Sequence, residues 1–134
     1  RMLNIILNDK LRLLNQEQFY CSLRGVSLDF LSEMDTTTIF ANLLDNALEA
    51  GNGNASFRLE LRGEQIQDFC VIKMSNTANG TYTPGKSTKT GHEGIGLENV
   101  RNAVEKYHGE MQTGQKGNVF SVTLLFPDSS GLSN

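Results

Sequence analysis

The stretch "TTTIFANLLDNALEAGN", residues 36–52, carries two patterns at helical spacing. Apolar side chains recur so that they form one buried stripe, made of Ile39, Phe40, Leu43, Leu44, Ala47 and Leu48. Polar side chains at i, i+3, i+4 and i+7 share the opposite face, namely Asn42, Asp45, Asn46 and Glu49. Asp35 and the three threonines offer N-caps, so we expect a helix that runs from Ile39 to Ala50.

Two asparagines on the polar face of this helix call for an explanation. Exposed helix faces usually carry Lys, Glu, Gln and Arg, because Asn is a poor helix former. Asn42 and Asn46 lie one turn apart, and their amide oxygens are hard ligands that suit Mg²⁺ shared with substrate phosphates. The spacing alone leaves a magnesium site and an ordinary solvated face both open.

The elements around this helix follow from periodicity. Leucines at helical spacing predict a helix over residues 1–16, and a short strand follows over 19–23. Residues 57–62 and a segment that ends near Ser75 alternate as a hairpin joined at "RGEQ", residues 62–65. A second helix follows Gly94 and Gly96 and ends before Gly109, and strands near Met111 and over 119–126, joined by "GQKG", close the chain. The pattern predicts an α/β fold, a two-layer sandwich with one mainly antiparallel sheet.

Length and charge exclude some classes of protein. The 134 residues suffice for one domain with its own core. A net charge of −3 argues against a general nucleic-acid binder. The sequence shows no signal peptide and no apolar run near the roughly 18–20 residues of a membrane span. Because the chain begins inside a helical pattern, we expect it to be part of a longer protein.

The stretch "GTYTPGKST", residues 80–88, matches the Walker A expression. A working P-loop needs a helix that begins at its Lys-Ser/Thr pair, but residues 86–94 contain two glycines and no apolar side chain. Pro84 also removes one backbone N–H from the nest that would hold phosphate. We therefore interpret the match as coincidental.

The segment over residues 69–92 contains Lys73, Lys86 and Lys89 and no carboxylate. In an acidic domain this is a local positive field that suits an anion, although a solvated loop would have the same composition. Gly94 and Gly96 come directly before the second helix, where glycines let backbone amides approach phosphate.

The order of these motifs is now complete: N-x-x-[DN]-N-A on a helix, a hairpin, Asn at a strand end, a polar segment, G-x-G-L, and a helix that ends in "YHG". It resembles the catalytic and ATP-binding domain of sensor histidine kinases, in the GHKL superfamily with its Bergerat fold. That fold is a mixed, mainly antiparallel sheet with helices on one face. The segments "NLLDNALEA", "STKTGHEGIGLENV" and "EKYHGEM" most resemble the Agr/Vir-type, peptide quorum-sensing branch. The resemblance covers residues 17–127, and it is specific because both glycine and asparagine motifs occur in this order.

The resemblance implies a role for each matching residue. Asn46 would coordinate Mg²⁺, and Asn42 would contact phosphate or complete the metal site. Asn76 stands where the family's adenine-reading Asp usually stands, and an amide oxygen can also accept from the adenine amino group. The remaining candidates would hold ATP phosphates from the lid and the next helix, with Lys89 also catalytic: Lys86, Ser87, Thr88, Lys89, His92, Gly94, Gly96 and Leu97.

The resemblance also implies the surrounding protein. Residues 1–16 would end a dimerisation and phosphoacceptor hairpin, residues 17–128 would be the catalytic domain, and residues 129–134 a disordered tail. The γ-phosphate of ATP would pass to a histidine on the upstream helix and then to a response regulator. The whole would be a dimeric, membrane-anchored bacterial sensor, of which this chain is a cytoplasmic part that touches neither nucleic acid nor membrane.

Two departures from the family pattern bear on activity. The D-x-G-x-G motif is replaced by "SNTANG", residues 75–80, which leaves open a degenerate nucleotide-binding or scaffold module. Hydrolytic relatives carry a glutamate base at the position of Asn42, whose amide cannot accept a proton at ordinary pH. This favours transfer of phosphate to another group over hydrolysis. A GHKL ATPase or serine kinase is the third alternative, and Asn42 argues against it.

Overall fold

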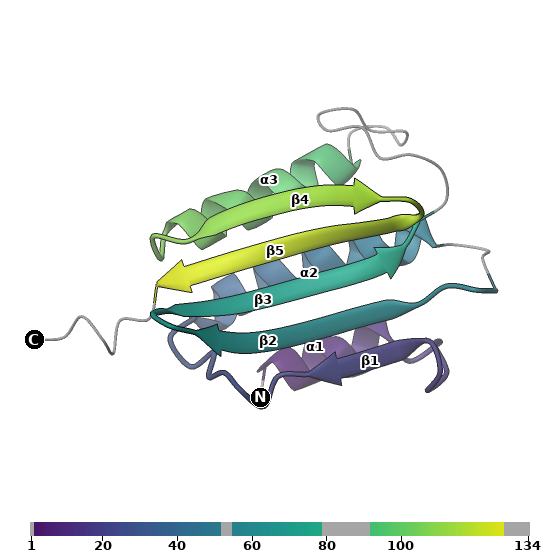
Figure 1. The fold of residues 1–134 in the computed structure, drawn as a ribbon, viewed down its shortest axis with the longest axis horizontal. Coiled ribbons are helices and arrows are strands. Elements are labelled where there is room, and N and C mark those ends of the chain that lie inside the picture. The colour runs from purple at the N-terminus through teal and green to yellow at the C-terminus, as the bar shows by residue number, and fades with distance from the viewer. Residues whose placement is uncertain (1, 52–54, 79–91, 128–134) are drawn as a thin grey trace, which may run out of the picture.

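The computed structural model describes residues 2–51, 55–78 and 92–127, which form two layers (Figure 1). The elements in chain order are α1 (Met2–Lys10), β1 (Phe19–Ser22), α2 (Glu33–Ala50), β2 (Leu59–Ile66), β3 (Phe69–Thr77), α3 (His92–Glu105), β4 (Glu110–Lys116) and β5 (Val119–Pro127). The strands form one sheet in the order β1-β2-β3-β5-β4, in which β1 pairs parallel to β2 and the other pairs are antiparallel. The helices all lie behind this sheet, so the predicted fold class is confirmed.

The core lies between the helices and the inner face of the sheet. From α2, Ile39, Phe40 and Leu44 have no exposed surface, as the apolar stripe predicts. They meet alternate residues of the strands, such as Leu61 and Ile72, which are also fully buried. No helix in the described part of the chain is long and apolar enough to cross a bilayer.

Helix α2 begins earlier than the threonines predict. Its N-cap is Ser32, whose hydroxyl accepts a hydrogen bond from the Asp35 N–H at 3.0 Å. Asp35 and Thr36 therefore lie in the first turn, and both are buried. The sequence signal for this cap is the S-x-x-D spacing of Ser32 and Asp35.

The other boundaries differ from the predictions because the turns lie elsewhere. Helix α1 ends at Lys10 rather than near residue 16. A separate turn comes before β1, in which Gln18 bonds both the backbone N–H and the carbonyl of Asn15. The hairpin of β2 and β3 turns at Gln67 and not at "RGEQ", residues 62–65, which lie within β2. The hairpin of β4 and β5 turns at Gly117, the last residue of "GQKG". Both turn residues have positive φ.

The end of α3 also differs in detail. Its left-handed residue is His108, with φ 62°, and not Gly109. Glycine is required at position 109 for another reason: a Cβ there would lie only 2.8 Å from the carbonyl oxygen of Leu125. The chain is thereby brought close to β5 before β4 begins.

Gly51 ends α2 against an aromatic ring, and this contact yields a prediction. A Cβ at Gly51 would lie 1.9 Å from Cδ1 of the buried Phe57. We expect Gly51→Ala to lower the free energy of unfolding by about 1–3 kcal/mol, because the ring must move within a packed core. Gly114→Ala is the matched control, since a Cβ there meets nothing within 4 Å. Urea denaturation measures both, and equal effects would contradict the assignment.

Candidate functional site

Helix α2 presents its polar residues to two different neighbours. Asp45 is exposed, and its Oδ1 lies 2.9 Å from Nζ of Lys10 on α1. Asn42 lies against Gly96 of α3. The polar face predicted as one surface is therefore divided, and Asn42 lies on the side toward α3.

The side chain of Asn42 is fixed by its own helix. Its Nδ2 donates to the carbonyl oxygen of Thr38 at 2.7 Å, and the side chain is half-buried. A Cβ on Gly96 would lie 3.3 Å from Asn42 Oδ1, which is closer than ordinary contact. Gly96 thus allows α3 to approach α2 at this point, and the amide oxygen of Asn42 faces α3.

Asn46 lies one turn further along α2 and is also half-buried. Within residues 2–51, 55–78 and 92–127, its side-chain amide has no hydrogen-bond partner. The same part of the chain contains no group of three or more His, Cys, Asp or Glu that could hold a metal ion. An amide oxygen that is half-sheltered and unbonded has the chemistry of a single protein ligand to Mg²⁺.

Asn76 is the third asparagine of the predicted site, and it is 4% exposed near the end of β3. The burial pattern of the strand places it on the inner face with Ile72 and Met74. Its Nδ2 donates to the carbonyl oxygen of Thr77 at 2.8 Å, which directs the amide oxygen elsewhere. This bond offsets part of the cost of burying a polar side chain among core residues, and it leaves the oxygen as the atom that a polar ligand could use.

The glycines of the second motif lie inside α3 and not before it, since the helix begins at His92. The sequence expectation that Gly94 and Gly96 precede the helix is therefore wrong. Gly94 lies in the first turn, where backbone N–H groups have no acceptor within the helix, whereas Gly96 and Leu97 lie beyond it. Leu97 is 8% exposed and belongs to the core. The side chain of His92 and four candidates lie outside the described residues: Lys86, Ser87, Thr88 and Lys89.

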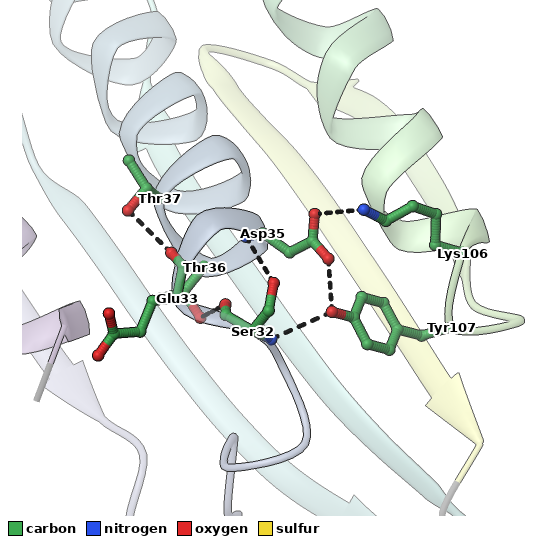
Figure 2. Close-up of polar contacts among 7 residues, drawn as sticks. All are labelled: Ser32, Glu33, Asp35, Thr36, Thr37, Lys106 and Tyr107. Carbon is green, nitrogen blue, oxygen red and sulfur yellow. Dashed lines mark hydrogen bonds and ion pairs between the residues drawn. The ribbon is translucent and has the colours of Figure 1, made fainter.

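A polar cluster ties the start of α2 to the end of α3, and Figure 2 shows it. The Tyr107 hydroxyl donates to Asp35 Oδ2 and accepts from the Ser32 N–H at 3.1 Å. Nζ of Lys106 lies 2.9 Å from Asp35 Oδ1. We call Ser32, Asp35, Lys106 and Tyr107 the interhelix clamp.

The interhelix clamp changes the acidity of its buried carboxylate. Hydrogen bonds from Tyr107 and then from Lys106 hold the pKa of Asp35 below its ordinary value. The ring of Tyr107 also packs edge-on against Phe30 and Phe126, with centroids at 5.8 and 6.3 Å. The sequence pattern does not predict this cluster, because it offers Asp35 only as an N-cap and Tyr107 only as part of "YHG".

A cavity of about 370 Å³ lies at one end of the sheet, where β1, β2 and β5 begin and β3 ends. Its lining includes Tyr20, Glu60, Ser75 and Val119, and Asn76 contributes as well. Among the residues that the structure describes, none of α2 or α3 lines it. It is therefore distinct from the space that the predicted phosphate ligands border.

Solved structures that are similar to this chain include histidine kinases and their catalytic domains. The catalytic domain of histidine kinase ThkA has a TM-score of 0.68 and 18% identity, over 95% of this chain and 90% of that one. The histidine kinase domain of the blue-light activated histidine kinase EL346 from Erythrobacter litoralis has a TM-score of 0.70 and 17% identity, over 96% and 60%. The histidine kinase AdeS from Acinetobacter baumannii has a TM-score of 0.65 and 18% identity, over 95% and 63%. At these identities the likeness shows the fold.

The family follows from the sequence profile described as the GHKL domain, which matches residues 31–127. Because the match spans most of the chain, this protein belongs to the GHKL domain family. No curated protein matches the sequence at a significant level. The family and the fold together support a kinase or ATPase class.

The contact between Asn42 and Gly96 predicts a coupling between the two positions. Alanine is favoured over glycine within a helix by roughly 1 kcal/mol, but at Gly96 its methyl group must displace the Asn42 amide. We expect Gly96→Ala to stabilise the Asn42→Ala variant by about 0.5–1 kcal/mol more than it stabilises the wild type. Urea denaturation of the four proteins in this cycle measures the coupling, and additive effects would contradict the close contact.

The lowered pKa of Asp35 predicts how stability depends on pH. Its stabilising contribution is fully present above the unfolded-state pKa, near pH 4, and is lost as the pH falls through the folded-state pKa. We expect the difference in unfolding free energy between wild type and Asp35→Asn to be constant above about pH 5 and to shrink below about pH 4. Chemical denaturation between pH 3 and pH 7 measures it, and a constant difference over that range would refute the assignment.

Proposed function

We propose that this chain binds Mg-ATP between α2, β3 and the start of α3, as the kinase half of a sensor histidine kinase. The observation that carries the proposal is the amide of Asn46, half-buried on a helix and without a partner among the described residues. An asparagine there lowers helix propensity, and it gains no bond from the described residues in return. A metal ion shared with ATP phosphates would give its oxygen a partner.

The described contacts support a division of roles among the three asparagines. The Nδ2 groups of Asn42 and Asn76 donate to backbone carbonyls, so each presents an oxygen. The oxygen of Asn46 would bind Mg²⁺, and that of Asn42 would bind the same ion or one of its waters. The oxygen of Asn76 would accept from the adenine amino group. Bound Mg²⁺ supplies neutralisation of phosphate charge.

The phosphates also need donors, and the proposal takes them from α3 and the segment before it. The free N–H groups of the first turn, including that of Gly94, suit an anion. Gly96 allows α3 to lie close to Asn42, and Leu97 is the next residue of α3. Side chains that would close over the phosphates are Lys86, Ser87, Thr88, Lys89 and His92.

We propose phosphate transfer and not hydrolysis as the reaction. Asn42, which stands where hydrolytic relatives have a glutamate, has an amide that cannot take a proton from water at ordinary pH. Phosphoryl transfer depends mostly on positioning and charge neutralisation, which amides, lysines and a metal ion can supply. The acceptor would be a histidine on an upstream helix.

The wider context is proposed from the resemblance of sequence segments alone. The chain would belong to the Agr/Vir-type branch, in a homodimeric, membrane-anchored sensor that passes phosphate to a response regulator. Residues 1–16 would join the phosphoacceptor hairpin to the catalytic domain over 17–128, with a tail over 129–134. The competing reading is a degenerate module, for which the replacement of D-x-G-x-G by "SNTANG" is the support.

A thermal-shift measurement with Mg-ATP distinguishes the proposed kinase half from the degenerate module. If Kd is near 10 μM, millimolar Mg-ATP stabilises the folded chain by about 2.7 kcal/mol, and the degenerate module predicts no shift. We expect Asn46→Ala to raise Kd by about tenfold or more, because one metal ligand is lost, and Lys86→Ala to raise it far less.

Asp45→Ala is the control for that comparison. It lies next to Asn46 on the same helix, is exposed, and bonds Lys10 of α1. The Asp45→Ala variant should bind Mg-ATP with the same Kd as the wild type. Equal losses for Asn46→Ala and Lys86→Ala would refute the proposed metal site, and steady phosphate release by the chain would favour an ATPase.

A further inference from the structure

The interhelix clamp joins the two helices that would hold the phosphates. Asp35 is 5% exposed, and both of its carboxylate oxygens are bonded to the segment at the end of α3, one by Tyr107 and one by Lys106 (Figure 2). The Tyr107 hydroxyl in addition accepts from the backbone N–H of Ser32, the residue whose side chain caps α2. The start of α2 is thus bonded, through three polar contacts, to the two residues that directly follow α3.

A second contact between the same helices lies further along. Asn42, seven residues after Asp35, is about 10 Å away along the axis of α2 and touches Gly96. Asn46 follows at about 16 Å from Asp35. A helix packed in a core is stiff. If α2 tilts about its first turn, Asn46 therefore moves further than Asp35 does.

The hydroxyl of Tyr107 is not needed to hold its own ring. That ring packs edge-on against Phe30 and Phe126, whose centroid distance from each other is 5.1 Å. The hydroxyl therefore acts on the groups it bonds, which all belong to the first turn of α2 and its cap. Hydrogen bonds are directional, so they fix the position of that turn more closely than apolar contacts do.

The energetics of a buried carboxylate point the same way. Removing Asp35 from water costs free energy that its partners offset, and apolar replacements of such groups are often as stable or more so. The clamp therefore contributes to the placement of α2, whatever balance remains between the cost of burial and the bonds that offset it. Its position at the far end of α2 from Asn46 keeps it out of contact with any ligand bound there.

We propose that Tyr107 and Asp35 are positioning residues for the nucleotide site: through the clamp they set the placement of α2 against α3, and so the fit of Asn42 and Asn46 to the phosphates. This inference rests on the proposed function. Asn76, which would read adenine, lies on β3 and is not bonded to the clamp. Loss of the clamp should therefore weaken the phosphate half of the site and spare the adenine half.

The test is Tyr107→Phe, with Kd measured by calorimetry for Mg-ATP and for adenosine. We expect Kd for Mg-ATP to rise about three- to tenfold, and Kd for adenosine to change less than twofold. Lys106→Arg, which keeps the ion pair, should bind both as the wild type does. Thr37→Ala is the matched control, because among the described residues the Thr37 hydroxyl bonds Glu33 in the same turn and no residue of α3.

Two outcomes would overturn the inference: unchanged Kd for Mg-ATP, or equal weakening for both ligands, which a general loss of structure would cause. If Tyr107→Phe does not fold, Lys106→Gln carries the same test, since the Lys106 side chain is 61% exposed. If the wild type binds neither ligand, the proposed function fails, and the inference is then judged without ligand. In that case the side-chain amide NMR signals of Asn42 and Asn46 should shift in Tyr107→Phe and not in Thr37→Ala; unshifted signals would refute it.

Discussion

Burial of the apolar stripe of α2 sets the rotation of that helix about its axis. Ile39, Phe40 and Leu44 are completely buried against the sheet, and exposing any one of them would cost about 1.5–3 kcal/mol. Since successive residues are separated by roughly 100° around a helix, this fixes where every other side chain points. Asn46 falls at the border of the stripe, which is why it is half-buried, and Asp45 falls outside it, where it meets Lys10.

The approach of α3 to α2 depends on two residues that a helix would ordinarily avoid. Asn42 lowers the helix propensity of α2, and Gly96 lowers that of α3 by roughly 1 kcal/mol relative to alanine. The two meet across the interface, where the missing side chain of one leaves room for the amide of the other. Two residues of low helix propensity that meet at one point are expected at a functional site, because their cost in stability is tolerated where function requires that geometry.

The sequence predicts the layers and the buried stripe of α2 well, because both follow from periodicity over many residues. It places the turns less well: the hairpin turns at Gln67, a residue with positive φ that no simple turn rule selects. It predicts the residue types of the site but not their partners. Nothing in the sequence pairs Asp35 with Tyr107, which lie 72 positions apart, so the clamp is visible only once α3 has been placed beside α2.

The hydrogen bonds of the asparagines in the described structure explain how an acidic chain could bind an anionic ligand. In Asn42 and Asn76 the NH₂ group is taken by a backbone carbonyl, so these side chains offer oxygens, which suit cations and donor groups. Under the proposed function those oxygens would meet a metal ion and an amino group, while the phosphates would be met by the first turn of α3. The site would thus separate its acceptors, on α2 and β3, from its donors on α3. The relative placement of α2 and α3 then decides whether metal and phosphate can be held together, which is why a bond between these helices matters even at a distance from the ligand.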